Sequence, residues 1–286
     1  MIHVLALLGV LSISFSAVFV RLASVSPVTA TFYRAAYATP ILLVLWLAQR
    51  SGDRRPARER WLAVLSGVIL AVDLNLWHES IALVGAGLGT VIPNVQVVFV
   101  AAAAWLLYGE RPSRGRALTI ALVLVGVVCT SGLARGDAYG SNPVTGAALG
   151  LMAGVAYAAF LLVYREANRS TSPRSGPLLD STIGVLAGAI ASVPFDRHFT
   201  LTPSASAHLS LFLLALVSQV VGWLLIGSVL LRLSAIETSV MLLGQPVFAL
   251  IWGMLLFGEH LSTLQWIGTG IVLAGVWTMM ATDVSR

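Results

Sequence analysis

The densest group of polar side chains in the sequence interrupts an apolar run near residues 61–83 and comprises Asp73, Asn75, Trp77, His78 and Glu79. Asn75, His78 and Glu79 have the i, i+3, i+4 spacing that places side chains on one face of a helix. If this run spans a bilayer, a charge at its centre costs at least about 2.5–3.5 kcal/mol. We therefore expect this face either to line a wet, substrate-binding cavity or to join helices, with Glu79 paired to His78 or to Arg34.

Two carboxyl groups of this segment have the chemistry of a proton carrier. Asp73 and Glu79 lie about a turn and a half apart on a helix, so they face different directions. Ionisable side chains inside a membrane commonly mark proton or substrate pathways. We expect Asp73 or Glu79 to carry a proton if transport is coupled to protons; the alternative is a facilitator driven by the substrate gradient.

A second group of polar side chains lies near the middle of two further apolar runs. Asn94 and Gln96 follow Pro93 in one run, and Gln245 precedes Pro246 in the other. A proline inside a helix leaves the carbonyl one turn earlier without its hydrogen-bond partner, and helices interrupted in corresponding places of two halves are typical of transporter binding sites. We expect both prolines to break their helices and the three amides to line a cavity; a simple bend is the alternative.

Three aromatic side chains, Trp77, Tyr157 and Trp223, lie deep within apolar runs rather than at their ends. At the ends of spans, aromatic residues anchor helices at the membrane surface. Deeper rings suit an apolar or cationic part of a substrate, so these three are candidates for substrate contact. Packing against neighbouring helices is the alternative.

The motifs of intramembrane enzymes and channels are incomplete. His78 and Glu79 begin the zinc-binding pattern H-E-x-x-H, but alanine occupies position 82. The sequence has no G-x-S-x-G nucleophile motif and no charged ring or filter loop of a channel. Its single cysteine, Cys129, excludes a disulfide framework. We expect no catalytic residue, no metal and no cofactor.

The elements that position these side chains are apolar segments of membrane-spanning length. Of the 286 residues, 58% are hydrophobic and 10% charged, whereas soluble domains carry about 25% charged residues. A spanning helix needs about 20 apolar residues. Ten runs of about this length occur, near 3–22, 28–48, 61–83, 86–108, 117–134, 145–164, 178–194, 209–231, 235–257 and 263–282. The predicted fold class is an all-α integral membrane protein with ten transmembrane helices.

All seventeen basic residues are arginine, and their distribution predicts how the chain crosses the membrane. With a cytoplasmic N-terminus, the outer segments hold three arginines, Arg21, Arg135 and Arg197, and Arg34 lies within a span. The thirteen others fall on the cytoplasmic side: Arg50, Arg54, Arg55, Arg58, Arg60, Arg111, Arg114, Arg116, Arg165, Arg169, Arg174, Arg232 and Arg286. This excess follows the positive-inside rule, so both termini are predicted to be cytoplasmic. The basic charge therefore does not indicate a nucleic-acid partner.

The first run has no basic segment before it, so we expect a retained helix rather than a signal peptide.

The two halves of the chain resemble each other at an offset of 149 residues. Residues 96–110 read QVVFVAAAAWLLYGE and residues 245–259 read QPVFALIWGMLLFGE, with seven of fifteen positions identical. A unit of five helices is odd, so the second copy enters the membrane from the opposite side, as in the inverted repeats of many secondary transporters. We expect one repeat over residues 1–134 and the other over 145–282, with substrate held near the midplane at their interface.

Both aligned segments end in Gly-Glu. Gly109 and Gly258 are expected to close their helices in the left-handed conformation, and Glu110 and Glu259 to fix the tight turns that follow. The five-plus-five layout, together with the proline-to-Gly-Glu ending of the fourth and ninth runs, resembles the drug/metabolite transporter superfamily. Over essentially its whole length the chain is similar to ten-helix exporters built from two EamA-type repeats, and it is most similar to the YddG-type exporters of aromatic amino acids.

This resemblance implies a secondary transporter of the bacterial inner membrane that works as a monomer in the lipid bilayer. By alternating access it would export aromatic and neutral amino acids, with broad specificity, and related metabolites. Small relatives that expel cationic drugs use a glutamate in the first helix, but this chain has no carboxylate before Asp53. An exporter of other metabolites or drugs, a channel and an intramembrane enzyme are the alternatives.

Overall fold

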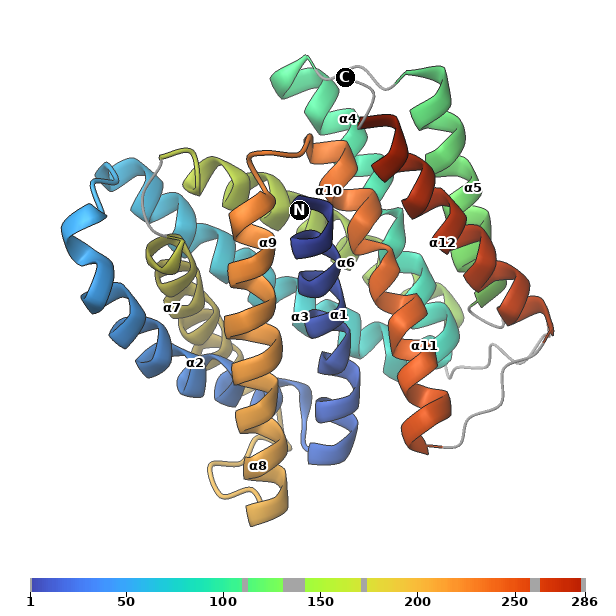
Figure 1. Ribbon diagram of the computed structural model, residues 1–286. Helices are drawn as coiled ribbons and strands as arrows, with labels where there is room; N and C mark the ends of the chain where they lie inside the picture. The colour runs from blue at the N-terminus through green and yellow to red at the C-terminus, as the bar shows by residue number, and fades with distance from the viewer. Residues whose placement is uncertain (1, 110–112, 131–141, 171–173, 258–262, 284–286) are drawn as a thin grey trace. The chain divides into compact units, whose positions relative to one another are not determined.

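The computed structural model describes residues 2–109, 113–130, 142–170, 174–257 and 263–283, and helices are the regular elements in these ranges (Figure 1). The α-helices are α1 (Ile2–Ala23), α2 (Pro27–Gln49), α3 (Ala57–Val91), α4 (Gln96–Tyr108), α5 (Arg114–Thr130), α6 (Pro143–Ala167), α7 (Ser175–Ser192), α8 (Ala205–Leu213), α9 (Trp223–Val229), α10 (Ala235–Leu242), α11 (Gly244–Phe257) and α12 (Thr263–Asp283). The 3-10 helices are η1 (Arg50–Gly52), η2 (Ile92–Val95) and η4 (Val193–Phe195), and η5 (Leu214–Gly222) is a π-helix.

Among the described residues, seven helical segments are long and apolar enough to cross a membrane: Ile2–Ala23, Pro27–Gly52, Ala57–Ser80, Val144–Ala167, Ser175–Phe195, Ala205–Val229 and Ala235–Leu256. Three shorter apolar helices cover Ile92–Tyr108, Ala117–Gly126 and Trp266–Gly275. The all-α membrane fold class predicted from the sequence is therefore confirmed. These segments fall on the ten apolar runs, so the structure is compatible with ten spans.

One helix boundary differs from the sequence-based expectation. The apolar runs place a break near residues 84–85, but α3 continues to Val91, and the break falls at η2, Ile92–Val95. The glycines at 85, 87 and 89 permit a turn but do not require one, since their backbone groups still form helical hydrogen bonds. Pro93 lacks an N–H and cannot do so, which explains why the helix ends beside the proline.

The described residues form two compact units that do not follow the sequence halves. Unit 1 comprises residues 1–75 and 159–232, and unit 2 comprises residues 76–158 and 233–286. Each unit therefore combines helices from both halves of the chain, and α3 and α6 contribute residues to both units. Membership of a unit decides which side chains the structure brings together.

In unit 1, helices approach one another closely wherever small residues face each other. The α2 and α7 helices lie side by side (Figure 1), and α3 passes α7 at Gly67 and Gly184. A Cβ atom at Gly184 would overlap the carbonyl oxygen of Val64, and one at Gly67 would overlap that of Ser181. Small interfacial residues let membrane helices pack at short range, so these glycines set the spacing of α3 and α7.

The close contact between α3 and α7 makes the stability of the protein sensitive to a single added methyl group. We expect Gly184→Ala to lower the free energy of unfolding by about 1–3 kcal/mol, because the added methyl group must displace backbone rather than a flexible side chain. The thermal unfolding midpoint of the purified protein in detergent measures this. The matched control is Gly270→Ala on α12, where no atom lies within 4 Å of the added Cβ. Equal midpoints for the two variants would contradict the assignment.

In unit 2, the α5 and α12 helices lie side by side, drawn in green and dark red (Figure 1). The α6 helix carries Gly146, Gly150 and Gly154 at four-residue intervals. Ser80 Oγ donates a hydrogen bond of 2.7 Å to the carbonyl oxygen of Gly146, and a Cβ at Gly154 would lie 2.9 Å from the carbonyl oxygen of Pro93. The glycine face of α6 therefore packs directly against the segment that contains the helix break.

The end of α4 agrees with the sequence prediction. Gly109 has φ of 69°, a left-handed conformation, and its N–H bonds to carbonyl groups of the last turn. Glycine adopts this conformation without the steric cost that a Cβ would impose. The second Gly-Glu pair, Gly258 and Glu259, and the first glutamate, Glu110, lie outside the described residues.

Candidate functional site

A buried polar cluster inside unit 1 joins the one arginine that the sequence places within a span to two neutral side chains. Arg34 on α2 is 7% exposed, and its Nε donates a hydrogen bond of 2.7 Å to Gln219 Oε1 on η5. Gln219 Nε2 in turn donates to Thr182 Oγ1 on α7 at 3.1 Å. The Gln219 amide and the Thr182 hydroxyl are both completely or almost completely buried. The Arg34 guanidinium is also held away from water, and the bond to Gln219 supplies one of the hydrogen bonds that it needs.

Asp73 on α3 completes this cluster from a fourth helix. Its side chain is buried, and its carboxyl group is close enough to interact electrostatically with the Arg34 guanidinium. The four side chains, which we call the Arg34 cluster, are Arg34, Asp73, Thr182 and Gln219. Ionisable groups within a membrane are expensive, and most of them mark substrate or proton pathways.

Gln219 lies in a π-helix, the rarest of the helical conformations and one that is frequent at functional sites. This segment is held to α1 by a hydrogen bond of 3.2 Å from Ser218 Oγ to the carbonyl oxygen of Ser12. The sequence-based selection of candidates did not include Gln219 or Thr182. Gln219 stands in the middle of an apolar run, so the criterion that selected Gln96 and Gln245 would also have selected it. The partnership with Arg34, 185 residues away, carries no sequence signal.

The polar face predicted at Asn75, His78 and Glu79 is divided between the two units. Asn75 lies in unit 1 and donates a hydrogen bond of 2.7 Å to Ser192 Oγ on α7. His78 lies in unit 2, where its ring centroid is 4.9 Å from that of Trp77. Glu79 is exposed. The hydrogen bond shown for Arg34 goes to Gln219, so the structure supplies a partner for Arg34 that the sequence did not predict.

Two helices of unit 2 are interrupted at equivalent positions of the repeat. The 3-10 turn η2, which contains Pro93 and Asn94, separates α3 from α4. Leu243 separates α10 from α11, and at the offset of 149 residues it corresponds to position 94. Pro246 lies in the first turn of α11, and it leaves the carbonyl of residue 242, at the end of α10, without a helical partner. Discontinuous helices of this kind form the binding sites of several transporter folds.

The two repeat-equivalent glutamines lie beside these breaks and have different partners. Gln96 at the start of α4 donates through Nε2 to the carbonyl oxygen of Ser239 on α10 at 3.3 Å. Its Oε1 atom has no hydrogen-bond partner in the described part of the chain. Gln245 on α11 donates through Nε2 to the hydroxyl of Tyr157 on α6 at 3.5 Å. The structure therefore brings together two predicted site residues, Gln245 and Tyr157.

The other deep tryptophan, Trp223, belongs to the interior of unit 1. It is 2% exposed, and its ring meets those of Phe160 and Tyr164 on α6 at centroid distances of 4.9 and 5.8 Å, in edge-on geometry. These contacts are typical of a packed aromatic cluster. Of the two roles that the sequence left open for Trp223, the contacts in unit 1 favour helix packing.

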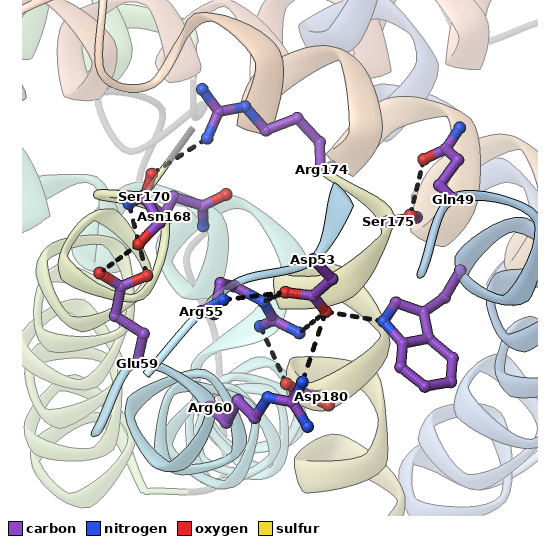
Figure 2. A network of polar contacts seen from close by, with 11 residues as sticks. Gln49, Asp53, Arg55, Glu59, Arg60, Asn168, Ser170, Arg174, Ser175 and Asp180 are labelled. Carbon is purple, nitrogen blue, oxygen red and sulfur yellow. Dashed lines mark hydrogen bonds and ion pairs between the residues drawn. The ribbon is translucent and has the colours of Figure 1, made fainter. Parts of the chain in front are cut away.

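A network of charged side chains occupies one end of unit 1 (Figure 2). Arg55 binds both carboxylate oxygens of Asp53, through Nε and Nη2 at 2.9 Å each, and forms an ion pair of 2.9 Å with Asp180 on α7. Trp46 Nε1 donates to Asp53 at 2.7 Å, and Arg60 approaches the same carboxylate at 3.9 Å. We call these five side chains the Arg55 network. It ties the connection between α2 and α3 to the first turns of α7.

Further bonds near the Arg55 network join α2 and α3 to the connection between α6 and α7 and to the start of α7. Ser170 donates to Glu59 at 2.8 Å, and Ser175 donates to Gln49 at 2.9 Å (Figure 2). Gly176 passes directly over the ion pair, since a Cβ there would lie 2.6 Å from Arg55 Nη2. Bidentate pairs between arginine and carboxylate are among the strongest polar contacts in proteins, so this end of unit 1 is firmly fixed.

Burial acts to raise the pKa of Asp53, but the hydrogen bonds from Arg55 and Trp46 outweigh this effect and hold the pKa well below its usual range. Asp53 therefore stays ionised at any physiological pH. Its negative charge compensates the buried Arg55 guanidinium, whose side chain is 1% exposed. The charges of the Arg55 network neutralise one another. The network therefore has a structural role and holds the α2–α3 connection against α7.

The chain has long apolar helices that carry buried polar groups, and two of these helices are interrupted at equivalent positions of a repeat. These features define a multi-pass membrane protein of the transporter class. The model of the EamA-like transporter family matches residues 1–132 and 144–281, and the chain belongs to this family.

The names of two relatives agree with this class, and a structural neighbour shares the fold. The protein named uncharacterized transporter YwfM of Bacillus subtilis is 24% identical over 250 residues, which cover 84% of this chain and 79% of the relative. An uncharacterized transporter of Archaeoglobus fulgidus is 24% identical over 271 residues, or 94% of each chain. A protein crystal structure with 16% sequence identity has the same fold, with a TM-score of 0.81 over 96% of both chains.

Proposed function

We propose that this EamA-family transporter exports amino acids, mainly aromatic and neutral ones, and related metabolites, by alternating access. The observation that carries the proposal is the pair of repeat-equivalent glutamines beside the two helix breaks of unit 2, with Tyr157 bonded to one of them. A zwitterionic amino acid needs neutral hydrogen-bond donors and acceptors for its carboxylate and ammonium groups. Amides, a phenol and the carbonyl groups released at helix breaks supply both kinds of group.

The surroundings of Arg34 argue against an organic phosphate as the cargo. A phosphate is best bound by arginine side chains that present several donors to it. Arg34 is the arginine that lies well within a span, and its guanidinium is engaged by Gln219 beside the carboxyl group of Asp73. A binding site of neutral polar groups therefore favours amino acids over nucleotide sugars or phosphates.

The orientation and location form part of the same proposal. The thirteen arginines assigned to one side predict cytoplasmic termini, and the YddG-type resemblance points to export across a bacterial inner membrane by a monomer. Asn94, Gln96, Tyr157 and Gln245 are the proposed substrate-binding residues of unit 2, together with Trp77 and His78.

The test is counterflow in liposomes that contain the purified protein. Vesicles preloaded with one unlabelled amino acid should take up the same amino acid in radiolabelled form, and a panel should show preference for aromatic and neutral side chains. Protein-free liposomes with the same load give the background. Uptake at background for every amino acid, by protein that is folded and oriented in the membrane, would exclude the substrate proposal.

A further inference from the structure

Helix α3 turns one face outward along its part in unit 1. The exposed residues of this face are three, four and seven positions apart, a spacing that keeps them on one side of a helix. They are Arg58, Trp61, Leu65 and Val72. Trp61 is 72% exposed, and Leu65 and Val72 are 48% exposed each. The buried residues of the same stretch are Glu59, Ala63, Ser66, Leu70 and Asp73. Because this stretch belongs to the apolar segment Ala57–Ser80, its outward face lies against lipid and ends in a tryptophan and an arginine.

The segment that leads into this face has its carboxylates inside and most of its arginines outside. Residues 50–60 contain five arginines and two carboxylates, a net charge of +3. The Asp53 side chain is 1% exposed and is bound by Arg55. Glu59 is buried, and its two oxygens accept hydrogen bonds from the N–H and the hydroxyl of Ser170 at 3.3 and 2.8 Å. The exposed arginines are Arg50, Arg54, Arg58 and Arg60. The surface beside the apolar face is therefore positive, because the carboxylates of this segment are turned inward.

The length of the outward face matches one leaflet of a bilayer. At about 1.5 Å per residue, the helix rises about 16 Å from Trp61 to Val72. Half of a hydrocarbon core about 30 Å thick is about 15 Å. Tryptophan is enriched at the level of the lipid headgroups, so Trp61 at that level places Val72 near the middle of the bilayer. Arg58 then lies one turn further out, where the phosphate groups of the lipids are.

We propose that Arg54, Arg58, Arg60 and Trp61, which we call the Arg58 patch, bind the headgroup of an anionic phospholipid whose acyl chain lies along Leu65 and Val72. Guanidinium groups bind phosphate through paired, charge-assisted hydrogen bonds, and clustered arginines beside a spanning helix attract anionic lipids. A zwitterionic phospholipid brings an ammonium group that the positive surface repels. A free phosphate has no apolar chain and gains nothing from the outward face of α3. The inference does not depend on which substrate is transported.

The experiment measures the thermal unfolding midpoint of the purified protein in a neutral detergent while a phospholipid is added. Phosphatidylglycerol at about a hundredfold excess over its Kd should raise the midpoint by about 5 °C or more. Phosphatidylcholine and inorganic phosphate should leave the midpoint near its starting value. Arg54→Gln combined with Arg58→Gln should raise the phosphatidylglycerol concentration that gives half of the shift by about 25-fold, or about fivefold for each arginine. Without lipid, this double variant should unfold close to the wild-type temperature, since both arginines are exposed.

Two further variants locate the lipid on the protein. Arg197→Gln is the matched control, since Arg197 is exposed on the connection that follows α7, and it should keep the wild-type response. Brominated phosphatidylglycerol should quench the tryptophan emission of the wild type more than brominated phosphatidylcholine does, and Trp61→Phe should lack this excess.

Several results would overturn the proposal. They are equal midpoint shifts with the two phospholipids, a wild-type response of the double arginine variant, an equal loss in Arg197→Gln, and excess quenching that persists in Trp61→Phe. A shift with inorganic phosphate as large as that with phosphatidylglycerol would assign the arginines to a soluble anion and refute a lipid site.

Discussion

Replacement of Arg55 by leucine should lower the free energy of unfolding by about 3–5 kcal/mol, the cost typical of breaking a buried ion pair from one side. Arg55 is 6% exposed and serves two carboxylates, Asp53 and Asp180, at 2.9 Å each. Without the guanidinium, both carboxylates lose their closest compensating charge, and Arg60, 3.9 Å from Asp53 with a half-exposed side chain, remains as a weaker one. The thermal unfolding midpoint in detergent should fall sharply, and the yield of monodisperse protein should fall with it.

A matched control separates the buried arginine from its neighbours. Arg58 stands three residues further along, is exposed on the first turn of α3, and should tolerate leucine with a change within about 0.5 kcal/mol. Equal losses for Arg55→Leu and Arg58→Leu would refute the role of the Arg55 network.

The ion pair also has a signature in the pH dependence of stability. Asp53 has a lower pKa in the folded protein than in the unfolded chain, so the unfolded state binds more protons at acidic pH. The contribution of ionised Asp53 to the free energy of unfolding is complete above about pH 4. It decreases as the pH falls through the pKa of Asp53 in the folded protein. Asp53→Asn should therefore unfold at a lower temperature at neutral pH and show a flatter profile in acid.

The double variant Gln96→Ala with Gln245→Ala should reduce counterflow by about two orders of magnitude at normal expression. Each glutamine supplies hydrogen-bonding groups beside a helix break, and the loss of one buried polar partner costs about 1–3 kcal/mol, or about tenfold or more in rate. We expect each single variant to lose about tenfold, measured as the initial rate of radiolabelled amino-acid uptake.

Gln49→Ala provides the control for this prediction. Gln49 is exposed at the end of α2, where it accepts a hydrogen bond from Ser175 within unit 1, and it belongs to neither break. Counterflow by this variant should match the wild type. Wild-type rates in the double variant, with the same amount of protein in the membrane, would remove Gln96 and Gln245 from the proposed site.

Several features of the protein followed from the sequence because they depend on local composition. The apolar runs determined the membrane fold class, since each helix satisfies its own backbone hydrogen bonds in lipid. Pro93 lies in the 3-10 turn between α3 and α4, and a proline removes a helical hydrogen bond whatever surrounds it. Gly109 adopted the left-handed conformation expected of a glycine after a helix. The repeated Gln and Gly-Glu spacing indicated the family to which the chain belongs.

The partners of the buried polar groups were decided only by the tertiary structure. From the sequence alone, Arg55 was one of thirteen arginines predicted to lie on the cytoplasmic side of the membrane. In the folded protein it is buried between Asp53 and Asp180. The sequence offered Glu79 as a possible partner of Arg34, but in the structure Arg34 donates a hydrogen bond to Gln219, 185 residues away. A buried charge or amide must find a hydrogen-bond partner, but helix packing determines which one. This packing also divides the chain into units that cut across both sequence halves.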